Sequence, residues 1–244
     1  MAQRVEAPPL HAFPISVLGR ARRRLAGIVL APLYRLYTDR LRRQVRQAVV
    51  PHHVAVILDG NRRWASEAGL RDLGAGHRRG ADKIDDLLDW CSDLGIGEVT
   101  LWALSGENLA RQTGELAALL DVVAEKLDAL VDHAARRPMR IRVFGRFDGF
   151  PARLLEAIER AEAATAPNGG LRLNIALGYS GRDELVDACR ALVGHLAARG
   201  VSAAEMAEHV SEESLAAHLY TAGAPDPDLI IRTSGEVRLS GFLP

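Results

Sequence analysis

HVAVILDGNRRW, at residues 53–64, is the stretch that decides the fold. Val54 to Leu58 form an unbroken apolar run rich in β-branched side chains, which is typical of a strand buried on both faces of a parallel sheet. The run ends at Asp59-Gly60-Asn61, a turn signal, and a helical pattern from Arg62 to about Ala68 follows. A buried strand that leads through a turn into a helix predicts the first unit of an α/β fold.

The same alternation continues along the chain. Further strands are expected at 99–104, 140–144, 171–177 and 228–232, and helices at 81–94, 113–135, 151–164, 183–198 and 203–219. Strands that alternate with helices predict an α/β domain with a mostly parallel central sheet flanked by helices. A length of 244 residues suits one such domain at 51–244, preceded by an N-terminal extension at 1–50.

The extension carries a helical pattern over 16–48, with arginines at 20 and 22–24. We expect a basic amphipathic helix that could contact a membrane surface peripherally, and a plain solvated helix is the alternative. No apolar run is long enough to span a membrane as a helix. The formal net charge is zero, which predicts no bulk attraction to nucleic acid.

The chain has two cysteines, Cys91 and Cys189, and they lie far apart inside apolar helical patterns. We expect two small buried side chains rather than a disulfide, since isolated cysteines are typical of a reducing compartment. The predicted location is therefore the cytoplasm, with peripheral contact to the inner membrane surface left open by the N-terminal helix.

Polar residues follow the predicted strands at the edge where open parallel sheets bind ligands. After the first strand, Asp59 offers the hard oxygen that Mg²⁺ prefers, and Gly60 lets the backbone approach an anion. Arg62 and Arg63 add donors suited to a diphosphate. The alternative is a common turn followed by surface arginines.

Two more strand ends carry similar groups. Ser105-Gly106-Glu107-Asn108 follows the second strand, where Ser105 could also be a helix cap, and Arg232-Thr233-Ser234 and Arg238-Leu239-Ser240 lie at the fifth. His77 opens a helix and is either a phosphate ligand or structural. Because no nucleophile–base pair is obvious, the sequence predicts a site that binds and ionises one polyanion.

These motifs, in this order, resemble those of the cis-prenyltransferases, the undecaprenyl diphosphate synthase family. The segments that carry the resemblance are HVAVILDGNRRWA at 53–65, SGEN at 105–108, GYSGR at 178–182, DPDLIIRTSGE at 226–236 and RLS at 238–240. PLYRLY at 32–37, with Arg62-Arg63, is similar to actinobacterial short-chain members, including (2Z,6E)-farnesyl diphosphate synthases. Ala103, which is small, is instead typical of long-chain members.

The resemblance implies an enzyme that uses Mg²⁺ to condense isopentenyl diphosphate onto an allylic diphosphate, as a homodimer. It implies catalytic roles for Asp59, which would also hold the metal, and for Asn108. It implies substrate contacts from Gly60, Asn61, Arg62, Arg63, Trp64, Arg71, His77, Ser105, Gly106, Glu107, Leu109, Arg111, Arg232, Arg238, Leu239 and Ser240.

An apolar tunnel for the growing chain is implied as well. Its expected lining is Trp102, Ala103, Leu116, Leu119 and Leu120, and core packing is the alternative for each of them.

The family pattern continues beyond Phe242 with a metal-binding glutamate and a further strand, whereas this chain ends at 244. On the resemblance we expect the catalytic domain to be truncated at its C-terminus. The alternative function is therefore an inactive fragment or a non-catalytic partner subunit.

The run Asp85-Asp86-Leu87-Leu88-Asp89 matches the Mg²⁺ motif of the all-α trans-prenyltransferases. Since it falls within one amphipathic helix of an α/β pattern, we expect a solvated helix face.

Overall fold

The computed structural model describes residues 36–69, 73–110 and 113–243. The chain divides into two compact units, Met1–Val49 and Val50–Pro244, and each is considered by itself. In the first unit, residues 36–46 form a helix, and the remaining part of the expected basic helix lies outside the described residues, apart from its last two positions. Within the described ranges, no helix is long and apolar enough to cross a membrane.

The second unit is built on a parallel sheet of five strands, as predicted. The strands are β1 (His53–Ile57), β2 (Glu98–Trp102), β3 (Met139–Phe144), β4 (Leu171–Ala176) and β5 (Leu229–Arg232). Their order across the sheet is β3-β4-β2-β1-β5, so β1 pairs with β2 on one side and with β5 on the other. The ends of β1, β2, β4 and β5 therefore open onto a common edge.

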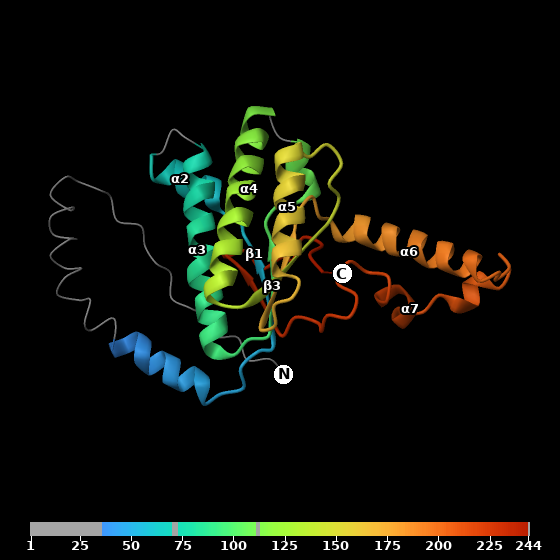
Figure 1. Cartoon of the computed structure of the whole chain (residues 1–244), viewed down its shortest axis with the longest axis horizontal. Helices are drawn as coiled ribbons and strands as arrows, with labels where there is room; N and C mark the ends of the chain where they lie inside the picture. The colour runs from blue at the N-terminus through green and yellow to red at the C-terminus, as the bar shows by residue number, and fades with distance from the viewer. Residues whose placement is uncertain (1–35, 70–72, 111–112, 244) are drawn as a thin grey trace. The chain divides into compact units, whose positions relative to one another are not determined.

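Three helices cover one face of the sheet: α3 (Leu73–Leu94), α4 (Thr113–Arg136) and α5 (Ala152–Thr165). They lie side by side in front of the strands (Figure 1). Val54 and Val56 of β1 pack into this core, whereas their neighbours Ala55 and Ile57 point to the opposite face. Both faces of β1 are buried, which explains its unbroken apolar run.

The opposite face is covered by aromatic side chains near the ends of the strands. Trp102 stacks on Phe242 with 5.1 Å between ring centroids, and Tyr179 meets both rings edge-on. The remaining helices are α2 (Asn61–Glu67), α6 (Gly181–Ala198) and α7 (Glu212–Ala216). Figure 1 shows that α6 projects away from the sheet.

Three sequence expectations were wrong in detail. α3 begins at Leu73 rather than Ala81, and the expected helix over 203–219 is only a 3-10 turn (Met206–His209) and the short α7. Ser211 explains that break, because it exchanges hydrogen bonds with Ser214 and starts a new helix. Cys189 is exposed, whereas Cys91 is buried as expected.

The aspartate run on α3 forms ion pairs instead of a metal site. Asp85 contacts Lys126 at 2.7 Å, Asp86 contacts Lys83 at 2.7 Å, and Asp89 contacts Arg137 at 3.0 Å. The parallel α/β sheet is incompatible with the all-α architecture that this motif serves elsewhere. The interpretation as a helix face therefore stands.

Candidate active site

A polar pocket of about 860 Å³ lies at the ends of β1, β2, β4 and β5. It gathers most of the residues predicted from the motifs, although they are up to 181 positions apart in the chain. Those that line it are Asp59, Gly60, Asn61, Arg62, Arg63, His77, Ser105, Gly106, Glu107, Asn108, Arg232, Arg238 and Ser240.

Five predicted residues do not line this pocket or fall outside the structure's description. Trp64 and Leu239 are exposed and do not line it, and Leu109 packs against the core instead. Arg71 and Arg111 lie outside the described residues. A shared motif thus places a residue near the site without deciding where its side chain points.

Arg182 and Glu236 also line the polar pocket, although the sequence analysis quoted their motifs without assigning either residue to the site. Arg182 comes shortly after β4, so the rule that identified the other strand ends would have found it. With Arg182 there are five arginines around the pocket and three carboxylates, those of Asp59, Glu107 and Glu236. The excess of guanidinium groups favours an anionic ligand.

Asp59 is the central acid of the pocket. Its Oδ2 accepts hydrogen bonds from Arg232 Nη2 at 2.6 Å and Nε at 3.0 Å, and its Oδ1 accepts from the Gly60 N–H at 2.7 Å. Burial would raise the pKa of Asp59, but the hydrogen bonds from Arg232 and Gly60 outweigh burial and hold that pKa below its ordinary value. Asp59 is therefore a carboxylate at neutral pH.

Arg232 links this acid to the last part of the chain. Its Nη1 donates to the carbonyl oxygen of Arg238 at 2.7 Å and to Ser240 Oγ at 3.1 Å, and its Nη2 lies 3.3 Å from Glu236. One guanidinium thus ties the end of β1 to the 238–240 segment. Such a rigid fork is a geometry that arginine provides and lysine does not.

The ends of β1 and β5 are joined by Thr233. Its Oγ1 accepts from the Asp59 N–H at 2.9 Å and donates to the Asp59 carbonyl oxygen at 2.6 Å. Gly60 then takes φ +94°, a left-handed conformation that glycine adopts without steric cost. These two features turn the chain sharply from β1 into α2 and leave the Asp59 carboxylate facing the pocket.

Gly80 of α3 lets Asn61 reach its position. A Cβ on Gly80 would lie 2.6 Å from Asn61 Oδ1, closer than real side chains approach. The glycines at 76 and 80 weaken the helical signal in the sequence, which is why the first two turns of α3 were not predicted. They are needed because α2 and α3 pack closely beside the site.

Ser105 fulfils its expected capping role and also lines the polar pocket. Its Oγ accepts the Asn108 N–H at 3.2 Å, at the start of η1 (Gly106–Ala110), a short 3-10 helix. On the other side, Arg63 donates to the Ser234 carbonyl oxygen at 2.9 Å, and Arg62 lies 3.1 Å from Glu115. The arginines are thus held in place by protein groups at the rim.

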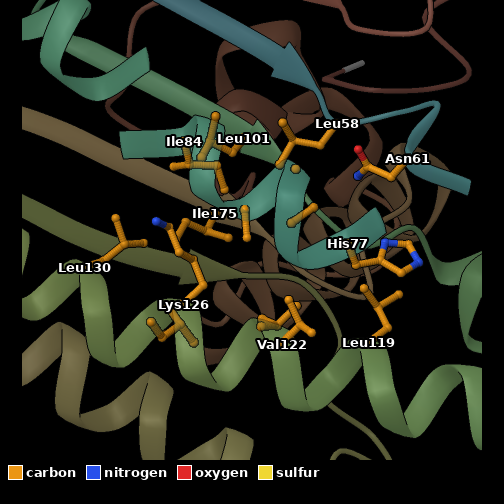
Figure 2. Close-up of a pocket in the computed structure, with 15 residues that line it drawn as sticks. Leu58, Asn61, His77, Ile84, Leu101, Leu119, Val122, Lys126, Leu130 and Ile175 are labelled. Atoms are coloured by element: carbon orange, nitrogen blue, oxygen red, sulfur yellow. The ribbon is translucent and has the colours of Figure 1, made fainter. Parts of the chain in front are cut away.

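A second, apolar pocket of about 60 Å³ runs from the polar pocket between α3, α4 and the sheet. The two pockets share Leu58, Asn61, His77, Ala103 and Leu119. Figure 2 shows Asn61 and His77 at one end and Leu130 at the other. The polar site therefore continues into an apolar arm.

The structure corrects the expected tunnel lining. Ala103 and Leu119 line the apolar pocket, whereas Trp102 lines the polar one. Leu116 and Leu120 line neither and pack with the core, which was the alternative considered for each.

Asp59 is also the residue that could hold Mg²⁺. Within the described part of the chain, no group of three or more acidic, histidine or cysteine side chains is arranged for a metal. A single carboxylate beside an anion pocket nevertheless fits Mg²⁺, which commonly takes one or two carboxylates and completes its shell with phosphate oxygens and water. The residues fit a metal that arrives with a diphosphate.

The fold and the two joined pockets define a class: an α/β protein whose site suits an anionic head group attached to an apolar tail. The chain belongs to the family described as putative undecaprenyl diphosphate synthase, whose model matches residues 57–244.

Relatives and solved structures agree with this assignment. The chain is similar to (2Z,6E)-farnesyl diphosphate synthase of Thermobifida fusca, with 48% identity over 89% of this chain and 84% of the relative. It is 46% identical to isoprenyl transferase 1 of Corynebacterium diphtheriae, over 86% of this chain and 78% of that relative. Lavandulyl diphosphate synthase from Lavandula x intermedia, solved in complex with dimethylallyl diphosphate, has a TM-score of 0.72 and 32% identity over 79% of this chain and 81% of that one.

Proposed function

We propose that this protein is a cis-prenyltransferase. It condenses isopentenyl diphosphate onto an allylic diphosphate, geranyl or farnesyl, and releases diphosphate and a prenyl diphosphate with a new Z double bond. The observation that carries the proposal is the arginine-lined polar pocket that opens directly into an apolar pocket. A prenyl diphosphate has the same two parts in the same order.

In the reaction the allylic C1–O bond breaks, C1 bonds to C4 of isopentenyl diphosphate, and C2 of that substrate loses a proton. Arg62 and Arg63, with the backbone of Gly60 and Asn61, hold the leaving diphosphate and stabilise the negative charge that develops on it. Bound Mg²⁺ would polarise the same phosphate oxygens as a Lewis acid, and Asp59 is the side chain that would hold it.

The second diphosphate lies toward β5. Arg232, Arg238 and Ser240 form a cluster there, tied together by the hydrogen bonds of Arg232, and they bind isopentenyl diphosphate. Ser105 and Asn108 line the wall contributed by the end of β2, from which they position the substrate and direct the departing proton. His77, at the junction of the pockets, assists with the allylic head group.

We further propose that the active protein is a homodimer in the cytoplasm, with peripheral membrane contact through its basic N-terminal segment. Exposed apolar side chains on α6 and on the edge strand β5 support the dimer, because apolar surface of this kind is typical of protein interfaces. These side chains are Leu185, Val186, Val193, Leu229 and Ile231. Light scattering on the purified chain tests the dimer, and a monomer at micromolar concentration contradicts it.

The function is tested by incorporation of labelled isopentenyl diphosphate into an extractable prenyl product, with geranyl or farnesyl diphosphate and Mg²⁺ present. We expect turnover by the native chain and its loss in Asp59→Asn. Asp86→Asn is the matched control, because Asp86 is an acid of the aspartate run on α3, where it pairs with Lys83 outside both pockets. Equal activity in Asp59→Asn and the native chain contradicts the proposed role of Asp59.

A further inference from the structure

We propose that the Asp85–Lys126 ion pair, which joins α3 to α4 at the far end of the apolar pocket, limits the length of the prenyl chain that the protein makes. The inference rests on the proposed function and deepens it: the preferred products are short. It assigns a specificity-determining role to two residues outside the diphosphate site.

The apolar pocket has a direction. Its mouth is formed by the residues that it shares with the polar pocket, among them Asn61, His77 and Ala103. In Figure 2 the positions on α4 run from Leu119 at this mouth through Val122 and Lys126 to Leu130. A chain that grows from the diphosphate site therefore moves toward Lys126 and Leu130.

Lys126 is the charged residue among an otherwise apolar set at this far end. Its stem lines the pocket, and its Nζ lies 2.7 Å from Asp85 Oδ1 on α3. The Lys126 side chain is 12% exposed and that of Asp85 is 44% exposed, so the pair spans the space between the two helices from inside to outside. His133 of α4 lies beside the same carboxylate, with its Nδ1 3.7 Å from Asp85 Oδ1.

A longer prenyl chain must move Lys126 aside or separate α3 from α4. Either movement breaks the ion pair and brings apolar carbon against a poorly solvated ammonium group, which is unfavourable. Shorter chains end before this point, beside aliphatic side chains such as Val122 and Val123.

The position of the ion pair also resolves the conflict over Ala103. Its small side chain suggests a long product, but Ala103 lines both pockets and therefore lies at the mouth. A small residue there widens the entrance and leaves the depth unchanged. The depth is fixed further in, where Lys126 crosses to α3.

The test compares the product lengths of Lys126→Met, Lys126→Ala and Asp85→Asn with those of the native chain, using geranyl diphosphate and excess isopentenyl diphosphate. Methionine keeps the stem of lysine and removes the charge. We expect the ratio of longer to shorter products to be about fivefold higher for Lys126→Met than for the native chain. Fivefold is the largest change, roughly, that loss of a partly exposed ion pair usually produces. The matched control is Lys83→Met, since Lys83 pairs with Asp86 on the exposed side of α3; its products should equal those of the native chain.

Calorimetric binding of saturated, unreactive alkyl diphosphates of increasing length provides a readout that needs no turnover. We expect the native chain to lose affinity beyond farnesyl length and Lys126→Met to retain it. If no variant turns over substrate but this shift in preferred length is seen, the ion-pair inference stands and the proposed function fails. An unchanged length preference in Lys126→Met overturns the inference. Longer products from Lys126→Ala but not from Lys126→Met overturn it as well, because side-chain volume and not charge would then be the cause.

Discussion

Replacing Arg232 with methionine should destabilise the protein far more than the same change at Arg238. Only 12% of the Arg232 side chain is exposed, and it donates to Asp59, to the Arg238 carbonyl oxygen and to Ser240. Methionine keeps the apolar stem and removes all of these hydrogen bonds. Arg238 is 73% exposed and contacts Glu236 through its side chain, so it serves as a matched control.

The expected magnitude follows from these contacts. A hydrogen bond to a charged group contributes about 1.5–3 kcal/mol. Because the Asp59 side chain is 39% exposed, water replaces part of the lost interaction, and screening reduces the ionic component to below about 1 kcal/mol. With the two contacts to the 238–240 segment included, Arg232→Met should lower the free energy of unfolding by about 2–3 kcal/mol. For a chain of this length that corresponds to a fall in Tm of about 4–12 °C.

The assay is thermal unfolding followed by circular dichroism at neutral pH, with urea unfolding as a second measurement. Arg238→Met should stay within about 0.5 kcal/mol of the native chain, as exposed substitutions usually do. Equal Tm values for the two variants would refute the conclusion that Arg232 holds the two sides of the site together.

Three further outcomes are expected. Gly80→Ala should lower catalytic efficiency several-fold while the helix content by circular dichroism stays constant. The new Cβ would lie 2.6 Å from Asn61 Oδ1, so the Asn61 side chain must leave its position in the site. Unaltered kinetics would contradict the close packing of Gly80 against Asn61. Hydrogen bonds from Arg146 and Tyr220 lower the pKa of Asp187 to about 2, so Asp187 adds stability above about pH 4 that disappears as pH falls toward 2. The difference in free energy of unfolding between the native chain and Asp187→Asn should therefore shrink to zero over that interval in acid unfolding curves. A difference that stays constant with pH would contradict these contacts. Burial raises the pKa of Cys91 to about 11, so iodoacetamide at pH 8 should alkylate exposed Cys189 and leave Cys91 intact in the folded protein, as peptide mass analysis would show.

Much of this architecture was predictable because strands of a parallel sheet leave a clear signal. Val54 to Leu58 and Val99 to Leu104 had to be buried on both faces, and polar residues after such strands had to meet at one edge. That rule alone brought together Asp59, Ser105 and Arg232. Arg182 follows from the same rule.

The remainder depended on tertiary contacts that a local pattern does not contain. The start of α3 is rich in glycine, which lowers helix propensity, yet it is helical because α2 packs against it there. Leu120 and Ala103 read alike as apolar residues, but only Ala103 points into the apolar pocket. Asp85 and Lys126 lie 41 positions apart in the sequence, on different helices, so no periodicity in either helix indicates their pairing.

Formation of a Z double bond at the joined pockets is the reaction that we propose for this chain. It is tested most directly by the geometry of the bond formed when the purified chain extends geranyl diphosphate with isopentenyl diphosphate and Mg²⁺, determined by nuclear magnetic resonance on the isolated product. We expect a Z bond, formed by the native chain and by Asp86→Asn and absent from reactions with Asp59→Asn. A product with an E bond, or activity that is lost with Asp86 rather than Asp59, would contradict it.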